Sequence, residues 1–252
     1  MEASPQATPA RSVPWAEVSL FFAVACLVSA PFRLHLIDLS AIAPLPWGLG
    51  LFFRVLRGIG PAVGYFVVRR LLKSKVPRTT TFWGRSRPAS LCAMAVIPAG
   101  LAIAGVANSL GLSSHYYGLL SGVVLACYAL GEEYGWRGYL QQALAPLALP
   151  LRVFVIGTLW YAWHLNFLVP QVTLATHAIH FAALLLGAWG LLRITDATQS
   201  ILFAAAVHLS FNILSDVDIE RPAALLVLGA AAIAWIVLVR RLLRQPAIAV
   251  VG

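Results

Sequence analysis

The sequence predicts an all-α protein, a polytopic bundle of about eight transmembrane helices. Composition gives the first indication, because 60% of the 252 residues are hydrophobic and only 11% are charged. The mean hydropathy of +0.84 is far above that of ordinary soluble domains. The second indication is that apolar stretches close to the ~20 residues needed to cross a bilayer recur along the chain. The third is that the basic residues collect at the ends of these stretches.

The predicted spans follow one another with short connections. They cover residues 17–37, 50–68, 89–110, 117–143, 151–168, 173–193, 199–214 and 222–241, and the last is the most clearly apolar. Residues 41–57 allow a second interpretation, because Pro44, Pro46, Arg54 and Arg57 suit an interfacial or re-entrant segment better than a straight span. The number of spans is therefore seven or eight.

The chain is expected to divide into five parts. Residues 1–16 are rich in Pro and Ser, which predicts a short disordered tail. Residues 17–72 form accessory transmembrane helices, and residues 73–88 form a basic loop on the cytoplasmic side. Residues 89–243 form one helical core, and residues 244–252 a C-terminal tail.

The basic residues predict the orientation in the membrane. Although the net charge is +9, they do not form a soluble basic face interleaved with aromatics, so no nucleic-acid partner is expected. Basic residues without any acid separate the second and third spans, and others follow the last span: Arg69, Arg70, Lys73, Lys75, Arg78, Arg85 and Arg87, then Arg240, Arg241 and Arg244. By the positive-inside rule both segments are cytoplasmic, which also places both termini in the cytoplasm.

Two features at the N-terminal end bear on this topology. Arg33, Arg54 and Arg57 fall on the outer side and fit it least well. The first apolar run superficially resembles a secretory signal, but Pro31 directly follows the small residues of the candidate cleavage site, so a retained span is expected. The Ala-, Leu- and Arg-rich composition favours the cytoplasmic (inner) membrane of a bacterium.

Two adjacent carboxylates lie inside an apolar stretch, in the sequence GEEYGWRGYL that starts at Gly131. An ionisable residue inside a membrane is costly, on the order of 3 kcal/mol on insertion scales, and usually faces the bundle interior with a partner. Glu133 and Arg137 are four residues apart, so they can pair on one helical face. Glu132 is rotated by about 100° from Glu133 and is left for another task.

Two later spans carry further polar groups. His164 ends the sequence WYAWH, four residues after Trp160, and His208 and Asn212 lie four residues apart in HLSFN, on one helical face. A single intramembrane His or an isolated Glu–Arg pair is more often a packing contact between helices. Carboxylates, imidazoles and an amide on three separate spans instead indicate a shared site.

This combination resembles the three motifs of the CPBP family, which contains the type II CAAX prenyl endopeptidases and bacteriocin-processing membrane proteases. The family pattern of two glutamates, three residues and an arginine fits Glu132, Glu133 and Arg137. Its second motif, an aromatic residue four before a histidine, fits Trp160 and His164, although phenylalanine is common where Trp160 stands. Its third motif, a histidine four before an asparagine, fits His208 and Asn212. The resemblance covers roughly residues 89–215.

The resemblance implies a membrane-embedded active-site cavity in which a glutamate activates water. Glu132 would act as general base, and His164 would hold the same water. His208 and Asn212 would donate hydrogen bonds to the oxyanion. Glu133 and Arg137 would fix the helix and the side-chain rotamer of Glu132. Trp136 and Trp160 are candidates for lining the substrate cavity. The substrate would be a membrane-associated or lipid-modified protein, or a leader peptide.

Three alternatives remain. Zinc held by Glu132, His164 and His208 would leave an open coordination position, but the chain has no HExxH motif, and we expect no cofactor. A proton-coupled transporter would also bury Glu, His and Arg, although it predicts related halves that the sequence does not show. A non-catalytic membrane scaffold or immunity protein would use the same pocket only to bind a partner.

Overall fold

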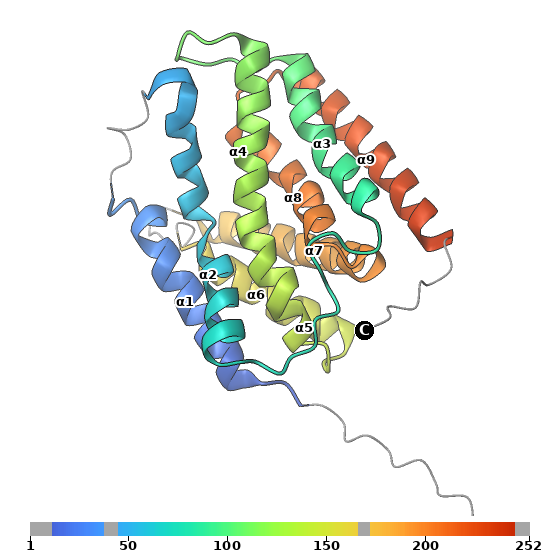
Figure 1. Cartoon of the computed structure of the whole chain (residues 1–252). Helices are drawn as coiled ribbons and strands as arrows, with labels where there is room; N and C mark the ends of the chain where they lie inside the picture. Colours follow the sequence, from blue (N-terminus) through green and yellow to red (C-terminus); the bar gives the residue numbers. More distant parts are fainter. Residues whose placement is uncertain (1–11, 38–44, 166–171, 245–252) are drawn as a thin grey trace, which may run out of the picture.

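The structure is a computed structural model that describes residues 12–37, 45–165 and 172–244. For residues 214–216 it describes the backbone alone. The described chain is a bundle of helices (Figure 1). In chain order these are α1 (Trp15–Arg33), η2 (Pro46–Arg57), α2 (Gly60–Phe66), η3 (Val67–Leu71), α3 (Arg87–Ala104), α4 (Ser114–Gly135), η4 (Trp136–Leu140), α5 (Gln141–Ala143), α6 (Leu149–Trp163), α7 (Leu174–Thr198), α8 (Ile201–Asp216) and α9 (Arg221–Arg244). The all-α prediction is confirmed.

Most of the predicted spans correspond to helices. Four helices among the described residues, α1, α3, α7 and α9, are long and apolar enough to cross a membrane. The helices α6 and α8 are apolar but shorter. The tail predicted at 1–16 lies mainly outside the described residues, and α1 already begins at Trp15. The tail predicted at 244–252 lies outside them except for Arg244.

The second predicted span, 50–68, is not one straight helix. The segment is a 3₁₀ helix (η2) followed, after a break, by α2 and the π-helical η3, and the two halves are bent by 58°. The break falls at Gly58 and Ile59, directly before Gly60 and Pro61. Pro61 has no N–H to donate, so an α-helical hydrogen bond cannot continue through it. This bend corrects the straight span predicted at 50–68 and is compatible with the re-entrant alternative given for residues 41–57.

Side-chain caps fix the starts of three helices. Ser86, Thr173 and Ser200 precede α3, α7 and α8, and in each case the side-chain oxygen accepts from the backbone N–H three residues later. These are the residue types that satisfy the unpaired N–H groups of a first helical turn. Between α7 and α8 the chain turns at Gln199, which has a left-handed conformation (φ 53°). The register of α8, which carries His208, is therefore fixed from its first turn.

The long helix α4 lies in the middle of the bundle (Figure 1) and takes part in one hydrophobic core, while η4, which continues it, takes part in the other. One core joins α1, η4, α6 and α7, and the other joins α3, α4, α8 and α9. Glycines let the neighbours of α4 approach closely. A Cβ at Gly122 would lie 2.6 Å from Cα of Pro98, and one at Gly135 would lie 2.5 Å from the carbonyl oxygen of Pro61. This packing surrounds the two glutamates of α4 with protein.

The segment between η3 and α3 is tied to the start of α8. The backbone of Thr81 accepts a hydrogen bond from Ile201 N–H (3.0 Å) and donates one to the carbonyl oxygen of Gln199 (2.9 Å). Phe82 accepts from Leu202 N–H (3.1 Å). The predicted loop at 73–88 therefore lies against the helical core rather than apart from it.

Candidate active site

Glu133 is the centre of a buried charged group. The Nε atom of Arg137 donates to its Oε2 at 2.8 Å, and Nδ1 of His208 donates to its Oε1 at 2.7 Å. The side chains of Glu133 and Arg137 are fully buried, and that of His208 is 5% exposed. The pairing expected from the four-residue spacing of Glu133 and Arg137 is present. The contact with His208 joins α4 to α8.

Glu132 is buried beside this group but has different partners. Its Oε2 accepts a hydrogen bond from the indole Nε1 of Trp160 on α6, at 2.9 Å. Its Oε1 lies 3.6 Å from Nη2 of Arg33 and accepts no hydrogen bond from the residues that the structure describes. A buried carboxylate oxygen has a strong need for a donor. A water molecule at Oε1 would meet this need.

The ring of Trp160 lies near the rings of both histidines. Its ring centroid is 6.1 Å from that of His164 and 5.3 Å from that of His208. His164, directly after the end of α6, has its Nδ1 2.8 Å from the carbonyl oxygen of Trp160. Because a carbonyl can only accept, Nδ1 carries the proton, and Nε2 of a neutral ring is by its chemistry an acceptor. The residues Glu132, His164 and His208 thus come from three helices to one place.

Asn212 follows His208 by one turn of α8 and is partly buried. Its place on the same face as His208 fits the expected oxyanion-binding pair. The structure adds a constraint for His208, because Nδ1 is already engaged by Glu133 and only Nε2 can serve a substrate. The joint role of His208 and Asn212 in holding an oxyanion stays a prediction.

The two tryptophans differ in their surroundings. Trp136 is fully buried in the core, with its ring edge-to-face against Phe21 (5.6 Å) and Trp163 (5.7 Å). Trp160 is also buried and holds Glu132 through its indole N–H. The structure thus gives Trp136 a packing role and Trp160 a role in orienting the carboxylate, and their expected contact with substrate stays a prediction.

Arg33 was not among the site residues predicted from the sequence. Its Nη2 donates to the hydroxyl of Tyr128 at 2.7 Å and lies 3.6 Å from Glu132. Its only signal in the sequence was a cation at the end of an apolar helix without a local acidic partner. Arg33 fits the predicted topology poorly because it is not a loop residue facing the aqueous phase. It is only 6% exposed, and its charge lies inside the bundle.

The zinc alternative would use Glu132, His164 and His208 as ligands. Within residues 12–37, 45–165 and 172–244, no three His, Cys, Asp or Glu side chains are arranged to hold a metal ion. His208 instead directs Nδ1 to Glu133, and His164 directs Nδ1 to a backbone carbonyl. These side chains do not fit a zinc site as they stand, and we derive no reaction step through a metal.

Residues 114–214 match the family described as type II CAAX prenyl endopeptidase Rce1-like. This segment is an Rce1-like domain. The match runs from the start of α4 into α8 and includes all three predicted motifs, which confirms the expected relationship to the CPBP family. Comparison with curated proteins and with solved structures gave no match.

The matched segment is thus similar to membrane endopeptidases of the CAAX protease type. Together with the apolar helices, this makes the chain an integral membrane protein. The Rce1-like domain contains Glu132, His164, His208 and Asn212. The helices α1 and α9 lie outside the match, so Arg33 reaches the site from a part of the chain that the family comparison does not cover.

Proposed function

We propose that this protein is an intramembrane endopeptidase that hydrolyses a peptide bond in a membrane-bound or lipid-modified protein or leader peptide. One observation carries the proposal. Glu132 is a buried carboxylate with Oε2 held by an indole N–H and Oε1 accepting no hydrogen bond from the described residues, beside histidines from two other helices. A carboxylate held in this way is suited to accept a proton from water.

In the first step, Glu132 takes a proton from water through Oε1 while Nε2 of His164 accepts the other hydrogen of the same water. The water oxygen forms a bond to the carbonyl carbon of the substrate, and the carbonyl electron pair moves to its oxygen. Holding water and substrate in one geometry removes much of the entropic cost of their meeting. The imidazole orientation needed for this step is supported by the Nδ1 contact of His164 with Trp160.

In the second step, the negative charge on the former carbonyl oxygen is stabilised by Nε2 of His208 and the amide of Asn212. A ring that donates from both nitrogens is an imidazolium, and the carboxylate of Glu133, 2.7 Å from Nδ1, faces that positive charge. The C–N bond then breaks, and the proton on Glu132 passes to the leaving amine. Loss of one oxyanion donor typically lowers the rate ~10² to 10³-fold.

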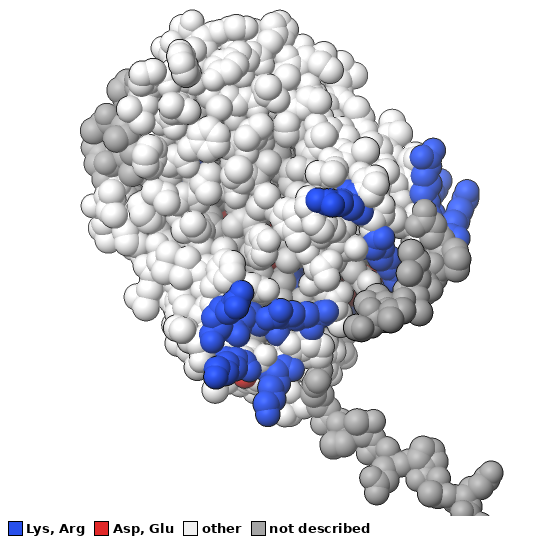
Figure 2. All heavy atoms as spheres, viewed as in Figure 1, with Lys and Arg blue, Asp and Glu red and all other residues white. Residues whose placement is uncertain are grey.

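The arrangement of charges supports an orientation for this enzyme. In Figure 2 the Lys and Arg side chains gather along the lower part and the right edge of the visible face, where Figure 1 shows the segment between η3 and α3 and the end of α9. The exposed basic residues of these segments are Lys73, Lys75, Arg78, Arg85, Arg87, Arg240, Arg241 and Arg244. By the positive-inside rule this end faces the cytoplasm, in our proposal that of a bacterium, with both termini on the same side.

The test uses purified protein in liposomes and a fluorogenic peptide that carries a farnesylated cysteine and a free C-terminus, with the unmodified peptide beside it. We expect multiple turnovers of the farnesylated peptide by the wild type and none by Glu132→Gln. Glu220→Gln is the matched control, because Glu220 is exposed and precedes α9. Its rate should equal that of the wild type.

Two results would count against the proposal. Cleavage by Glu132→Gln at the wild-type rate would show that Glu132 is not the general base. Stoichiometric binding of the peptide without turnover by the wild type would instead favour a non-catalytic scaffold. Preference for the farnesylated over the unmodified peptide would establish the lipid-modified class of substrate.

A further inference from the structure

Arg33 connects the N-terminal helix to the catalytic glutamate. It is the last residue of α1, and its side chain is 5% exposed. A buried guanidinium is costly unless its charge and its donors are matched by the surrounding protein. The partners of Arg33 therefore show what the surroundings are built to hold.

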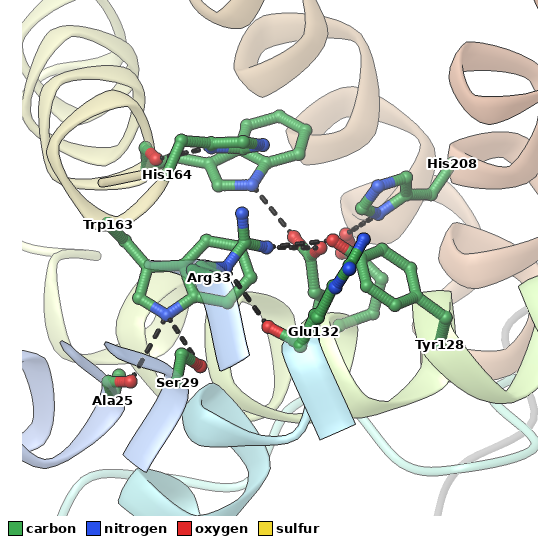
Figure 3. Close-up of polar contacts among 11 residues, drawn as sticks. Ala25, Ser29, Arg33, Tyr128, Glu132, Trp163, His164 and His208 are labelled. Carbon is green, nitrogen blue, oxygen red and sulfur yellow. Dashed lines mark hydrogen bonds and ion pairs between the residues drawn. The ribbon is translucent and has the colours of Figure 1, made fainter. Parts of the chain in front are cut away.

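The guanidinium makes polar contacts with two elements, η2 and α4 (Figure 3). Its Nε donates to the carbonyl oxygen of Arg57 at the end of η2, at 3.0 Å. Its Nη2 donates to the hydroxyl of Tyr128 and lies 3.6 Å from Oε1 of Glu132. Tyr128 and Glu132 are four residues apart on α4, so they present one face of that helix to Arg33.

The plane of the guanidinium is fixed by Trp163. The central carbon of the guanidinium lies 3.5 Å from the centroid of the Trp163 ring, a close cation–π contact. Trp163 is held in return by α1, because its indole N–H lies 3.2 Å from both the carbonyl oxygen of Ala25 and the hydroxyl of Ser29. The next residue after Trp163 is His164, which in the proposed mechanism holds the water.

This arrangement couples the two groups that must share one water. Arg33 touches α4 at Glu132 and touches α6 at the residue before His164. The Arg33–Glu132 distance of 3.6 Å gives Coulombic attraction without a hydrogen bond, so the electron pair of Oε1 is left for water. A shift of about 1 Å in such a site can reduce the rate ~10²-fold.

We propose that Arg33 is a positioning residue of the active site, which orients the Glu132 carboxylate and fixes the separation of Glu132 and His164 by bridging α4 and α6. The inference rests on the proposed function, since it assigns to Arg33 the support of the general base. It also gives α1, which lies outside the Rce1-like match, a part in catalysis.

The test compares Arg33→Gln and Arg33→Lys with the wild type in the farnesylated-peptide assay. We expect kcat of Arg33→Gln to fall ~10²-fold with KM within about threefold. Arg33→Lys should recover at least about tenfold of this loss, because lysine retains the charge. Arg152→Gln is the control. Arg152 is a partly buried arginine whose ion pair with Asp196 (3.2 Å) is lost in this variant, and kcat should be unchanged.

Each other outcome overturns the inference. If Arg33→Gln keeps the wild-type kcat while Glu132→Gln is inactive, the proposed function stands and the role of Arg33 is wrong. If only KM rises, Arg33 binds substrate rather than positioning Glu132. If Arg33→Lys recovers nothing and both variants lose thermal stability equally, the role of Arg33 is structural. Activity in Glu132→Gln would instead refute the proposed function itself.

Discussion

Two adjacent glutamates with different partners should respond differently to the same substitution. Glu133→Gln removes the charge that faces both Arg137 and His208, whose contacts with Glu133 are 2.8 and 2.7 Å long. Arg137 is fully buried, and its Nη1 and Nη2 have no hydrogen-bond partner among the described residues. Breaking one partner out of a buried pair typically costs about 3–5 kcal/mol. We expect the free energy of unfolding to fall by that amount.

Glu132→Gln should cost much less stability. A glutamine can still accept the hydrogen bond from Trp160, and Arg33 keeps its contacts with Trp163, Arg57 and Tyr128. The expected loss is about 0.5–1.5 kcal/mol, the range of one ordinary hydrogen bond. Cleavage, by contrast, should be abolished, since the amide has no basic oxygen to take the proton from water.

The assay is unfolding in mixed micelles with increasing SDS, followed by tryptophan fluorescence, together with turnover per folded molecule. Glu220→Gln serves as the exposed control and should lie within about 0.5 kcal/mol of the wild type. The reasoning is refuted if Glu133→Gln is as stable as the wild type, or if Glu132→Gln is the more destabilised of the two. Either result would mean that the two carboxylates do not have the separate roles described above.

Two single contacts and the metal-free mechanism each give one further prediction. Trp160→Phe removes the indole donor of Glu132 and should lower kcat about tenfold, whereas Trp235→Phe, which removes an indole bond to a backbone carbonyl on α3, should leave kcat unchanged. Gly135→Ala would place its Cβ 2.5 Å from a carbonyl oxygen of α2 and should destabilise the protein by about 1–3 kcal/mol. Gly190→Ala, with nothing within 4 Å of its Cβ, should leave the midpoint of thermal unfolding unchanged or raise it. Incubation with 1,10-phenanthroline, which removes zinc, should leave cleavage unchanged, and activity that is lost and returns with zinc would contradict the metal-free mechanism.

The sequence could predict those parts of the site that depend on local helical geometry. Glu133 and Arg137 pair because residues four apart share a face, whatever the rest of the fold does. The clustering of polar residues on three spans was likewise a sound signal, because burying them separately would be costly. Which glutamate would meet His208 depends on how α8 is rotated against α4, and helical spacing within either segment does not contain that information.

The contribution of α1 could not be predicted from spacing. Arg33 and Tyr128 are 95 positions apart, and their contact depends on how α1 packs against α4 and α6. The main prediction for the second span was a straight helix, and it did not include the bend. Gly58, Gly60 and Pro61 are residue types that favour a break in a helix. Mean hydropathy over a window does not detect such a break, because it averages across it. The helix is nevertheless interrupted there, since Pro61 has no N–H for an α-helical hydrogen bond.

The ties between Thr81, Phe82 and the first turn of α8 have a consequence for truncation. Ile201 and Leu202 have no earlier helical carbonyl to which they could donate, so the upstream segment supplies the acceptors. A fragment that began at residue 114, where the family match starts, would lack these acceptors and Arg33 as well. We therefore expect that a fragment starting at the boundary of the family match would not reproduce the histidine geometry of the intact chain.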